Sequence, residues 1–289
     1  FEIAPKINAA GRISQGKAAV ELMVSDNLKQ AHQIVNDIIT LNDSRREMDT
    51  SSTIEALLQV ETTGQVQNFS TVVYGSTWNK GVIGIVASRL TETYYKPTIV
   101  FADGNNGEMV ASARSIADFD VHDALEKCSD LFLKFGGHPA AAGLSMEKEK
   151  FDLFKEKFEK VVAENIQWHP KEPCIKFVAK VTIDDLDKDF FNFHRKLAPF
   201  GPDNMKPVLV LENQKVSGYV KTMGKESNHL KFFIKQDSTG KNIECVGFKL
   251  GNFADDFRQK TFDIAFTAEE NHWKGNVTYY LNIRDVKFN

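Results

Sequence analysis

The stretch from residue 135 to residue 145, FGGHPAAAGLS, holds residue types well suited to binding a phosphate. Gly136 and Gly137 allow backbone conformations that other residues avoid, and they can bring bare N–H groups close to an anion. His138 follows them and could donate a hydrogen bond to an anionic oxygen or move a proton. The same pattern also fits a tight turn with a capped, half-buried histidine, which is its more common use.

A second candidate is the run Ser112-Ala113-Arg114-Ser115, at the end of a predicted strand. The guanidinium of Arg114 can hold a phosphate with two parallel N–H donors, and the hydroxyls of Ser112 and Ser115 can add further donors. An exposed arginine at a strand end would have the same sequence. The residues alone favour neither interpretation.

Residues 1–12, FEIAPKINAAGR, contain a third set of candidate anion ligands, in which Lys6, Asn8 and Arg12 could converge. Pro5 and Gly11 argue against a clean helix, so we expect an irregular segment. A solvated segment with surface charges is the alternative. Trp78-Asn79-Lys80-Gly81 precedes a predicted helix whose first N–H groups could face an anion, although a loop anchored by its tryptophan fits equally well.

Helices and strands must together position these candidate residues. Residues 17–60 show apolar side chains with a 3.6-residue period, which predicts a long amphipathic helix or helix pair with Ser25 or Asp26 as its N-cap. Strands and helices then alternate, as is typical of an α/β or α+β domain. We predict strands at 71–74, 98–101, 109–115 and 142–146, helices at 82–94, 121–132 and 147–165, and a hairpin turn at 103–107.

The composition changes after the run from Trp168 to Pro173, where we place a domain boundary. Beyond it, short strand-like runs are separated by Gly, Asn and Asp turns, which favours a small all-β barrel such as the oligonucleotide-binding (OB) fold. The runs are 175–183, 207–211, 215–220, 229–236, 241–248, 262–269 and 277–283, with helices expected at 190–197 and 252–259.

Basic and aromatic residues alternate in this second half, as expected of a surface that follows a nucleic acid backbone and stacks its bases. Lys231 and Lys235 flank Phe232 and Phe233, and Trp273 lies at a predicted loop tip. Strand alternation requires one of the two phenylalanines to point inward. Ordinary solvated lysines beside a core phenylalanine would explain the same pattern.

The overall composition is that of a globular protein: 289 residues, 42% hydrophobic and 26% charged, with a net charge of −3. This length favours two domains. No apolar run approaches a membrane span and no signal peptide is visible. The chain opens without methionine, so we expect a fragment of a longer protein. Three widely spaced cysteines form no metal-type spacing and indicate the reducing cytoplasm.

Taken together and in order, FEIAPKINAAGR, TWNKGVIGIVASRL, SARS, FGGHPAAAGLS and LAPFGPDNMKPV resemble the RecJ family of single-stranded-DNA-specific exonucleases, within the DHH superfamily of phosphoesterases. The resemblance covers nearly the whole chain. The glycine–histidine motif alone is shared across DHHA1 domains, and its combination with LAPFGPDN and a following barrel is more specific. The resemblance implies the end of a DHH domain and connecting helices at 1–62, a DHHA1 domain at 63–168 and an OB-like barrel at 169–289.

Such a protein would degrade single-stranded DNA from 5′ to 3′ in repair and recombination, using Mn²⁺ or Mg²⁺. The chain has no Asp-His-His motif, so the resemblance implies that the metal ions belong to a missing N-terminal domain. This part would then hold DNA, bind no metal and be inactive alone. Single-stranded DNA is the implied partner, with a single-strand-binding protein or a helicase as further partners and no membrane.

The resemblance also assigns roles to the candidates. His138, with Gly136 and Gly137, would face the scissile phosphate, while Arg114, with Ser112 and Ser115, would grip a terminal or backbone phosphate. Asn8 and Arg12 would lie near the edge of the active site, and the barrel would extend the DNA track through Lys231, Lys235 and Trp273.

Two positions depart from the family pattern: Asn79 replaces a histidine and Lys6 an arginine.

Two alternative functions stay open. One is a DHH-superfamily phosphodiesterase acting on short nucleotides, and the other is a binding module without chemistry.

Overall fold

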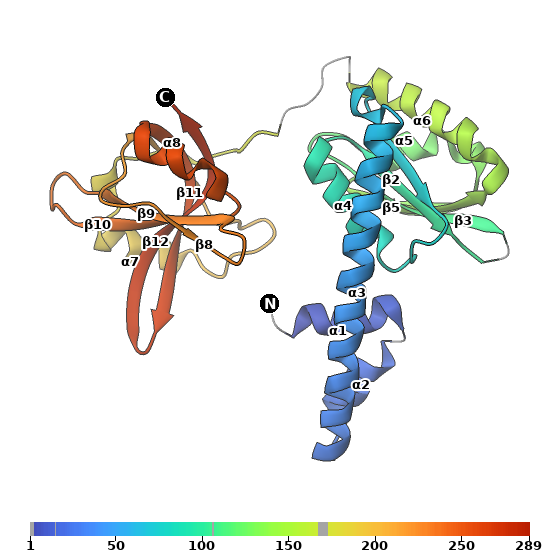
Figure 1. The fold of residues 1–289 in the computed structure, drawn as a ribbon, viewed down its shortest axis with the longest axis horizontal. Helices are drawn as coiled ribbons and strands as arrows, with labels where there is room; N and C mark the ends of the chain where they lie inside the picture. Colours follow the sequence, from blue (N-terminus) through green and yellow to red (C-terminus); the bar gives the residue numbers. More distant parts are fainter. Residues whose placement is uncertain (1–2, 15, 106, 167–172) are drawn as a thin grey trace. The chain divides into compact units, whose positions relative to one another are not determined.

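The chain folds as two units, Phe1–Pro173 and Cys174–Asn289, each with its own hydrophobic core (Figure 1). The computed structural model describes residues 3–14, 16–105, 107–166 and 173–289. The predicted boundary at 168–173 lies outside the described residues except for its last position. An α/β unit with connecting helices and a second unit built mainly of strands confirm the expected fold class.

Three helices open the first unit: α1 (Ala4–Ile13), α2 (Lys17–Val24) and α3 (Leu28–Thr62). The expectation of an irregular segment at 1–12 is wrong. Pro5 lies in the first turn of α1, where a missing N–H breaks no hydrogen bond, and burial of Ala9 and Ala10 stabilises the helix. The cap of α3 is Asn27 rather than Ser25 or Asp26, because its Oδ1 accepts hydrogen bonds from the N–H groups of residues 29 and 30.

The sheet of the first unit has the order β1-β2-β3-β5-β4, with β1 and β2 parallel and the other pairs antiparallel. Helix α4 (Ile83–Tyr94) packs on one face with α3, while α5 (Val121–Glu126) and α6 (Phe151–Ile166) cover the other. The strands are β1 (Thr71–Gly75), β2 (Thr98–Asp103), β3 (Glu108–Arg114), β4 (Phe132–His138) and β5 (Ala141–Glu147).

Two predictions for this unit need correction. The helix expected at 121–132 ends at Glu126, and a short 3₁₀ turn leads into β4. The glycine–histidine stretch is not a turn over its whole length. Its first half forms β4, because the backbone groups of Gly136 and Gly137 pair with β5, and only Pro139 and Ala140 form the turn.

A buried ion contact joins α3 to α4. Asp49 is 1% exposed, and its Oδ2 lies 2.6 Å from Nη2 of Arg89 on α4 and 3.5 Å from Nη1 of Arg45. Removing water from a carboxylate is costly unless cations face it. The contact therefore fixes the position of α4 relative to the helices before it.

The second unit is a seven-stranded sheet with the order β6-β7-β11-β12-β10-β9-β8. Its two edge strands, β6 and β8, do not pair with each other, so the expected barrel is not closed by hydrogen bonds within the described residues. Helices α7 (Lys188–Lys196) and α8 (Ala254–Gln259) flank it. The strands are β6 (Ala179–Lys180), β7 (Val208–Gln214), β8 (Lys221–Met223), β9 (His229–Lys235), β10 (Asn242–Gly247), β11 (Phe262–Trp273) and β12 (Asn276–Phe288).

Two expected strands of this unit are wrong or shortened. At 215–220 there is no strand, because Gly218 has a φ of +89° and turns the chain, so that β8 starts only at Lys221. At 175–183 only Ala179 and Lys180 are strand residues. The predicted inward phenylalanine is Phe232, which is fully buried.

We predict that Asp49→Asn lowers the free energy of unfolding of the first unit by about 3 kcal/mol, because a neutral amide leaves two arginines without their shared carboxylate. Hydrogen exchange of the β2 amides in the full chain measures this unit directly. Asp43→Asn is the matched control, since Asp43 is 60% exposed on the same helix and its loss should change little. Equal effects of the two substitutions would contradict the prediction.

Candidate functional site

The side chain of Arg114 lies between the end of β3 and helix α4. Its Nη1 donates to Ser112 Oγ at 3.0 Å and to the Ala113 carbonyl at 2.8 Å, and its Nε donates to Ser88 Oγ at 3.2 Å. Strand alternation buries Met109, Ala111 and Ala113 on the other face, which turns Ser112 and Arg114 toward α4.

Neutral groups are the only hydrogen-bond acceptors of Arg114, and the described residues give it no carboxylate partner. Burial lowers the pKa of its guanidinium, and the positive charge of Arg12 lowers this pKa further. Arg12 itself donates from Nη1 to the Gly81 carbonyl at 3.3 Å, at the start of α4, and has no ion pair among the described residues. Two neighbouring guanidiniums that form no ion pair among the described residues make a site for an anion.

Gly84, in the first turn of α4, allows this arrangement. A Cβ atom there would lie 2.9 Å from Arg114 Nη2 and 3.1 Å from Ser112 Oγ, so any side chain would displace both. Sequence analysis missed Gly84 and Ser88. The signal was available as a glycine inside an otherwise good helix, a position that usually has a packing or functional reason.

Strand register brings His138 to the same face as Arg114. Arg114 pairs with Ala141, which pairs with His138, and directly paired residues share a face. Two ladder spacings separate the backbones of Arg114 and His138 by about 10 Å. The neighbouring row is Ser112, Gly143 and Gly136. His138, Gly136 and Gly143 are exposed, so an anion can reach the sheet backbone between the cations.

The two adjacent glycines have different surroundings. Gly137 has a φ of +155°, and a Cβ atom on it would lie 2.5 Å from the Ala141 oxygen and from Ala142 Cα. A Cβ atom on Gly136 would meet no atom within 4 Å. Gly137 is therefore required by the fold, whereas Gly136 keeps the face beside His138 open.

The structure places the remaining candidates of this unit around that face. Ser115 donates from Oγ to the Phe119 carbonyl at 2.6 Å and from its N–H to the Ala140 carbonyl at 3.0 Å, which ties the end of β3 to the turn after His138. Asn8 is exposed one helical turn before Arg12 on α1, and therefore on the same side of that helix. Trp78 is buried and donates from Nε1 to Glu55, as expected of an anchored loop.

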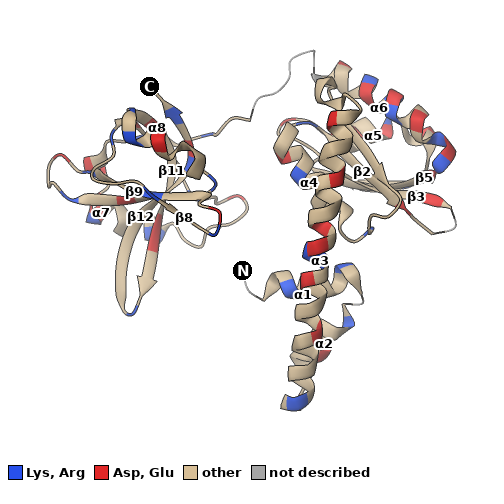
Figure 2. Cartoon of the chain, in the orientation of Figure 1, with Lys and Arg blue, Asp and Glu red and all other residues tan. Residues whose placement is uncertain are grey.

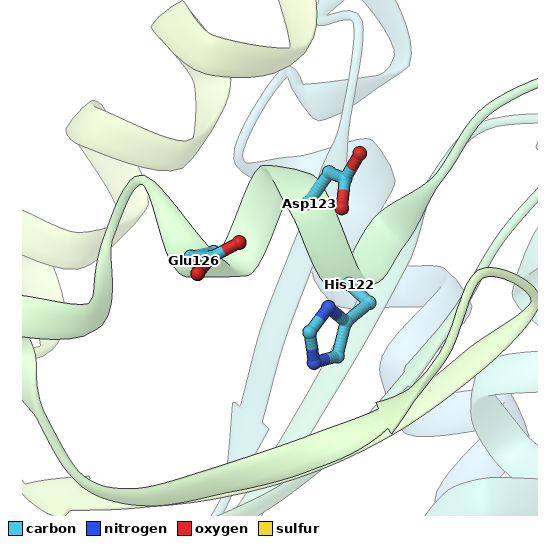
Figure 3. A group of neighbouring side chains, drawn as sticks. All are labelled: His122, Asp123 and Glu126. Carbon is cyan, nitrogen blue, oxygen red and sulfur yellow. The ribbon is translucent and has the colours of Figure 1, made fainter.

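One group of side chains in the described residues could offer ligands to a metal ion: His122, Asp123 and Glu126 on α5 (Figure 3). Their ligand atoms lie within 4.8 Å of one another. The ring of His122 lies against Phe135, which belongs to the face of β4 opposite to His138. Asp123 and Glu126 are exposed, and this group is not part of the Arg114 site.

In the second unit, one sheet face carries all three candidate residues, and we call it the outer face. Lys231, Phe233 and Lys235 alternate along β9 with the buried Phe232 and Ile234. Phe233 pairs with Glu244, which pairs with Tyr280, and the same side of β12 continues to Asn276, the partner of Trp273. Tyr280 is half-buried there, and burial, followed by Glu269 and Glu244, raises the pKa of its hydroxyl.

On the outer face, aromatic rings are exposed to solvent, whereas one of the two candidate lysines is held in an ion pair. Trp273 is 68% exposed at the β11–β12 hairpin tip, with Lys274 Nζ 5.9 Å from its ring, and Tyr219 is 65% exposed beside Phe233. Lys231 lies 2.5 Å from Glu244, so its charge is neutralised, while Lys235 is exposed. This face can stack bases and makes fewer phosphate contacts than its lysine count suggests.

Comparison with family models matches both units. The DHHA1 domain model matches residues 66–164, and the RecJ OB domain model matches residues 179–285.

Curated relatives carry the name single-stranded-DNA-specific exonuclease RecJ. The protein of Bacillus subtilis is 31% identical over 288 residues, which are 99% of this chain and 36% of that protein. The protein of Escherichia coli is 28% identical over 298 residues, again 99% of this chain and 50% of that protein. The chain thus spans about half or less of the length of these relatives.

Two crystal structures of RecJ from Thermus thermophilus are similar in fold to this chain. The complex with Mn²⁺ gives a TM-score of 0.80 at 26% identity, over 99% of this chain and 41% of that one. The complex with Mg²⁺ gives a TM-score of 0.76 at 25% identity, over 99% and 43%.

We predict that Gly137→Ala destabilises the first unit by about 2 kcal/mol or more, because the added methyl meets backbone atoms and the φ of this residue disfavours a side chain. Thermal unfolding of the full chain, with hydrogen exchange of β4 and β5, measures the loss. Gly136→Ala is the matched control and should unfold like the unchanged protein. The prediction is wrong if the two substitutions behave alike.

Proposed function

Because this chain belongs to the RecJ family, whose DHHA1 and OB domains it carries, we propose that it is the DNA-holding part of a 5′→3′ single-stranded-DNA exonuclease of repair and recombination. The observation that carries this proposal is the pair Arg12 and Arg114, two neighbouring guanidiniums that form no ion pair among the described residues. A phosphate of the DNA backbone would supply the missing negative charge.

The first unit would bind a phosphate through complementary groups. Arg114 is oriented by Ser88 and Ser112, so little freedom is lost when its remaining N–H groups bind phosphate oxygens. His138 would donate a hydrogen bond from the far side of the open face. Asn8, Gly136, Gly137 and Ser115 are the other proposed members of this site, and of these Gly137 and Ser115 would act by holding the loop and strand in place.

The RecJ structures named above hold Mn²⁺ or Mg²⁺, and we propose that hydrolysis of DNA uses such ions. Such ions would activate water for attack on the phosphorus. The described residues do not fit such a centre, because their one metal-type group lies on the opposite side of the sheet from Arg114 and His138, with His122 against Phe135. We therefore propose that the ions are bound by residues outside this chain and that this chain alone does not cleave DNA.

The second unit would extend the binding track through base stacking. Trp273, Tyr219 and Phe233 offer ring faces to unpaired bases of any sequence, and Lys235 adds a positive charge. This surface argues against a phosphodiesterase restricted to short nucleotides, because such an enzyme has no use for a second, stacking domain.

The same proposal extends to the cellular location and the protein partners. We propose a cytoplasmic location, since all three cysteines are free thiols and two of them are buried. Among the described residues, no helix is long and apolar enough to cross a membrane. As protein partners we propose a single-strand-binding protein or a helicase, either of which would deliver single-stranded DNA to the chain.

We predict that Arg114→Ala weakens the binding of a labelled single-stranded oligonucleotide by roughly tenfold or more, because the phosphate loses a charge-assisted contact. Fluorescence anisotropy at low and moderate salt measures affinity, which should fall with salt by a log–log slope of about −0.7 per contacted phosphate. Arg46→Ala, at an exposed position on α3, is the charge-matched control. A flat salt response, or equal losses for both variants, would argue against a DNA track.

We predict that Trp273→Ala weakens single-strand binding by roughly fivefold or more, whereas Trp273→Phe keeps most of the affinity because a ring remains to stack on a base. Duplex binding should not change, since paired bases offer no free ring face. Anisotropy titration of both DNA forms tests this. Equal losses for alanine and phenylalanine would remove stacking as the reason.

A further inference from the structure

Lys134 lies on the same face of the first-unit sheet as Arg114 and His138. It pairs with Ser145, which pairs with Val110, so this row is parallel to the two rows that hold Arg114 and Ser112. Lys134 precedes His138 by four residues on β4, a distance of about 13 Å along the strand. Gly136 and Gly143 lie between them, and a Cβ atom on Gly136 would meet no atom within 4 Å.

No carboxylate neutralises the positive charge of Lys134 among the described residues. Three other lysines of this unit are ion-paired: Lys148 with Asp103, Lys150 with Glu147 and Lys157 with Asp130. Figure 2 shows blue and red residues mixed along α6, which lies over the opposite face of the sheet. Lys134 is exposed and has no ion pair among the described residues.

Acidic residues limit the basic face beyond Lys134. The next pair along β3 and β5 is Glu108 with Glu147. The α4-side face therefore runs from Arg114 and His138, across open backbone at the glycines, to Lys134 and Ser145, and then meets two carboxylates. A polyanion on this face has favourable partners at both ends of a short path and none further on.

We propose that Lys134, with the hydroxyl of Ser145 opposite, binds a second phosphate of the strand whose first phosphate lies at Arg114 and His138. The inference rests on the proposed function and adds to it a preference for longer strands. The ammonium group contributes only when the ligand is long enough to reach it. Lys134 therefore favours oligonucleotides over dinucleotides, while Arg114 binds both.

The test is a length series of 5′-phosphorylated single strands, from dinucleotide to tetranucleotide to octanucleotide, titrated against the full chain by anisotropy or calorimetry. For the unchanged protein, affinity should rise with length. Lys134→Ala should remove roughly threefold to fivefold of that rise, lower the salt slope for the octanucleotide by about 0.7, and leave the dinucleotide unchanged. Lys134→Arg should restore the rise.

Two further variants make the result specific. Lys127→Ala removes the same charge at an exposed position after α5, on the other side of the sheet, and should have no effect at any length. Gly136→Leu places a side chain beside His138 and on the path between the two phosphates, so it should weaken the longer strands more than the dinucleotide.

The outcomes separate this inference from the proposed function. If Arg114→Ala weakens every length and Lys134→Ala matches Lys127→Ala, the second phosphate contact is wrong and the DNA-holding function stands. If no single strand binds the unchanged chain, or Arg114→Ala has no effect, both are overturned.

Discussion

The half-buried charge of Arg114 is the constraint on which the candidate site depends. A guanidinium taken partly out of water loses solvation, and here it regains only neutral acceptors: two serine hydroxyls and one carbonyl. Arg12 adds repulsion, since its charge lowers the pKa of Arg114 further. Holding two cations close together costs free energy, and a bound polyanion would offset that cost. We infer that the surrounding helices and strands hold that charge in position.

A short series of contacts leads from this charge into the helices. Ser88 on α4 accepts from Arg114, and the next residue, Arg89, contacts Asp49 on α3. Helix α1 packs on α3 and brings Arg12 to the start of α4. The distance between the two guanidiniums is therefore set by the packing of α1, α3 and α4, and the buried contact between Asp49 and Arg89 is part of that packing.

Sequence reasoning identified Arg114, Ser112 and His138 from their types, but it could not place them together. His138 shares a face with Arg114 only because β5 lies between β3 and β4, a sheet order that no local pattern encodes. The same limit explains the error at residues 1–12, where Pro5 and Gly11 argued against a helix that burial of Ala9 and Ala10 stabilises. Periodic segments such as α3 and β9 were predicted correctly, because their side-chain pattern reports burial directly.

The two units differ in what they can recognise, and this difference bears on how the proposed DNA track could bind a strand of any sequence. The first unit offers cations and open backbone, which suit phosphates. On the outer face of the second unit, Glu244 neutralises Lys231, so rings rather than charges dominate there. Neither a phosphate contact nor a stacking contact reads a base edge. In the proposed function, contacts to the backbone would let the chain bind any sequence, and stacking on unpaired bases would distinguish a single strand from a duplex.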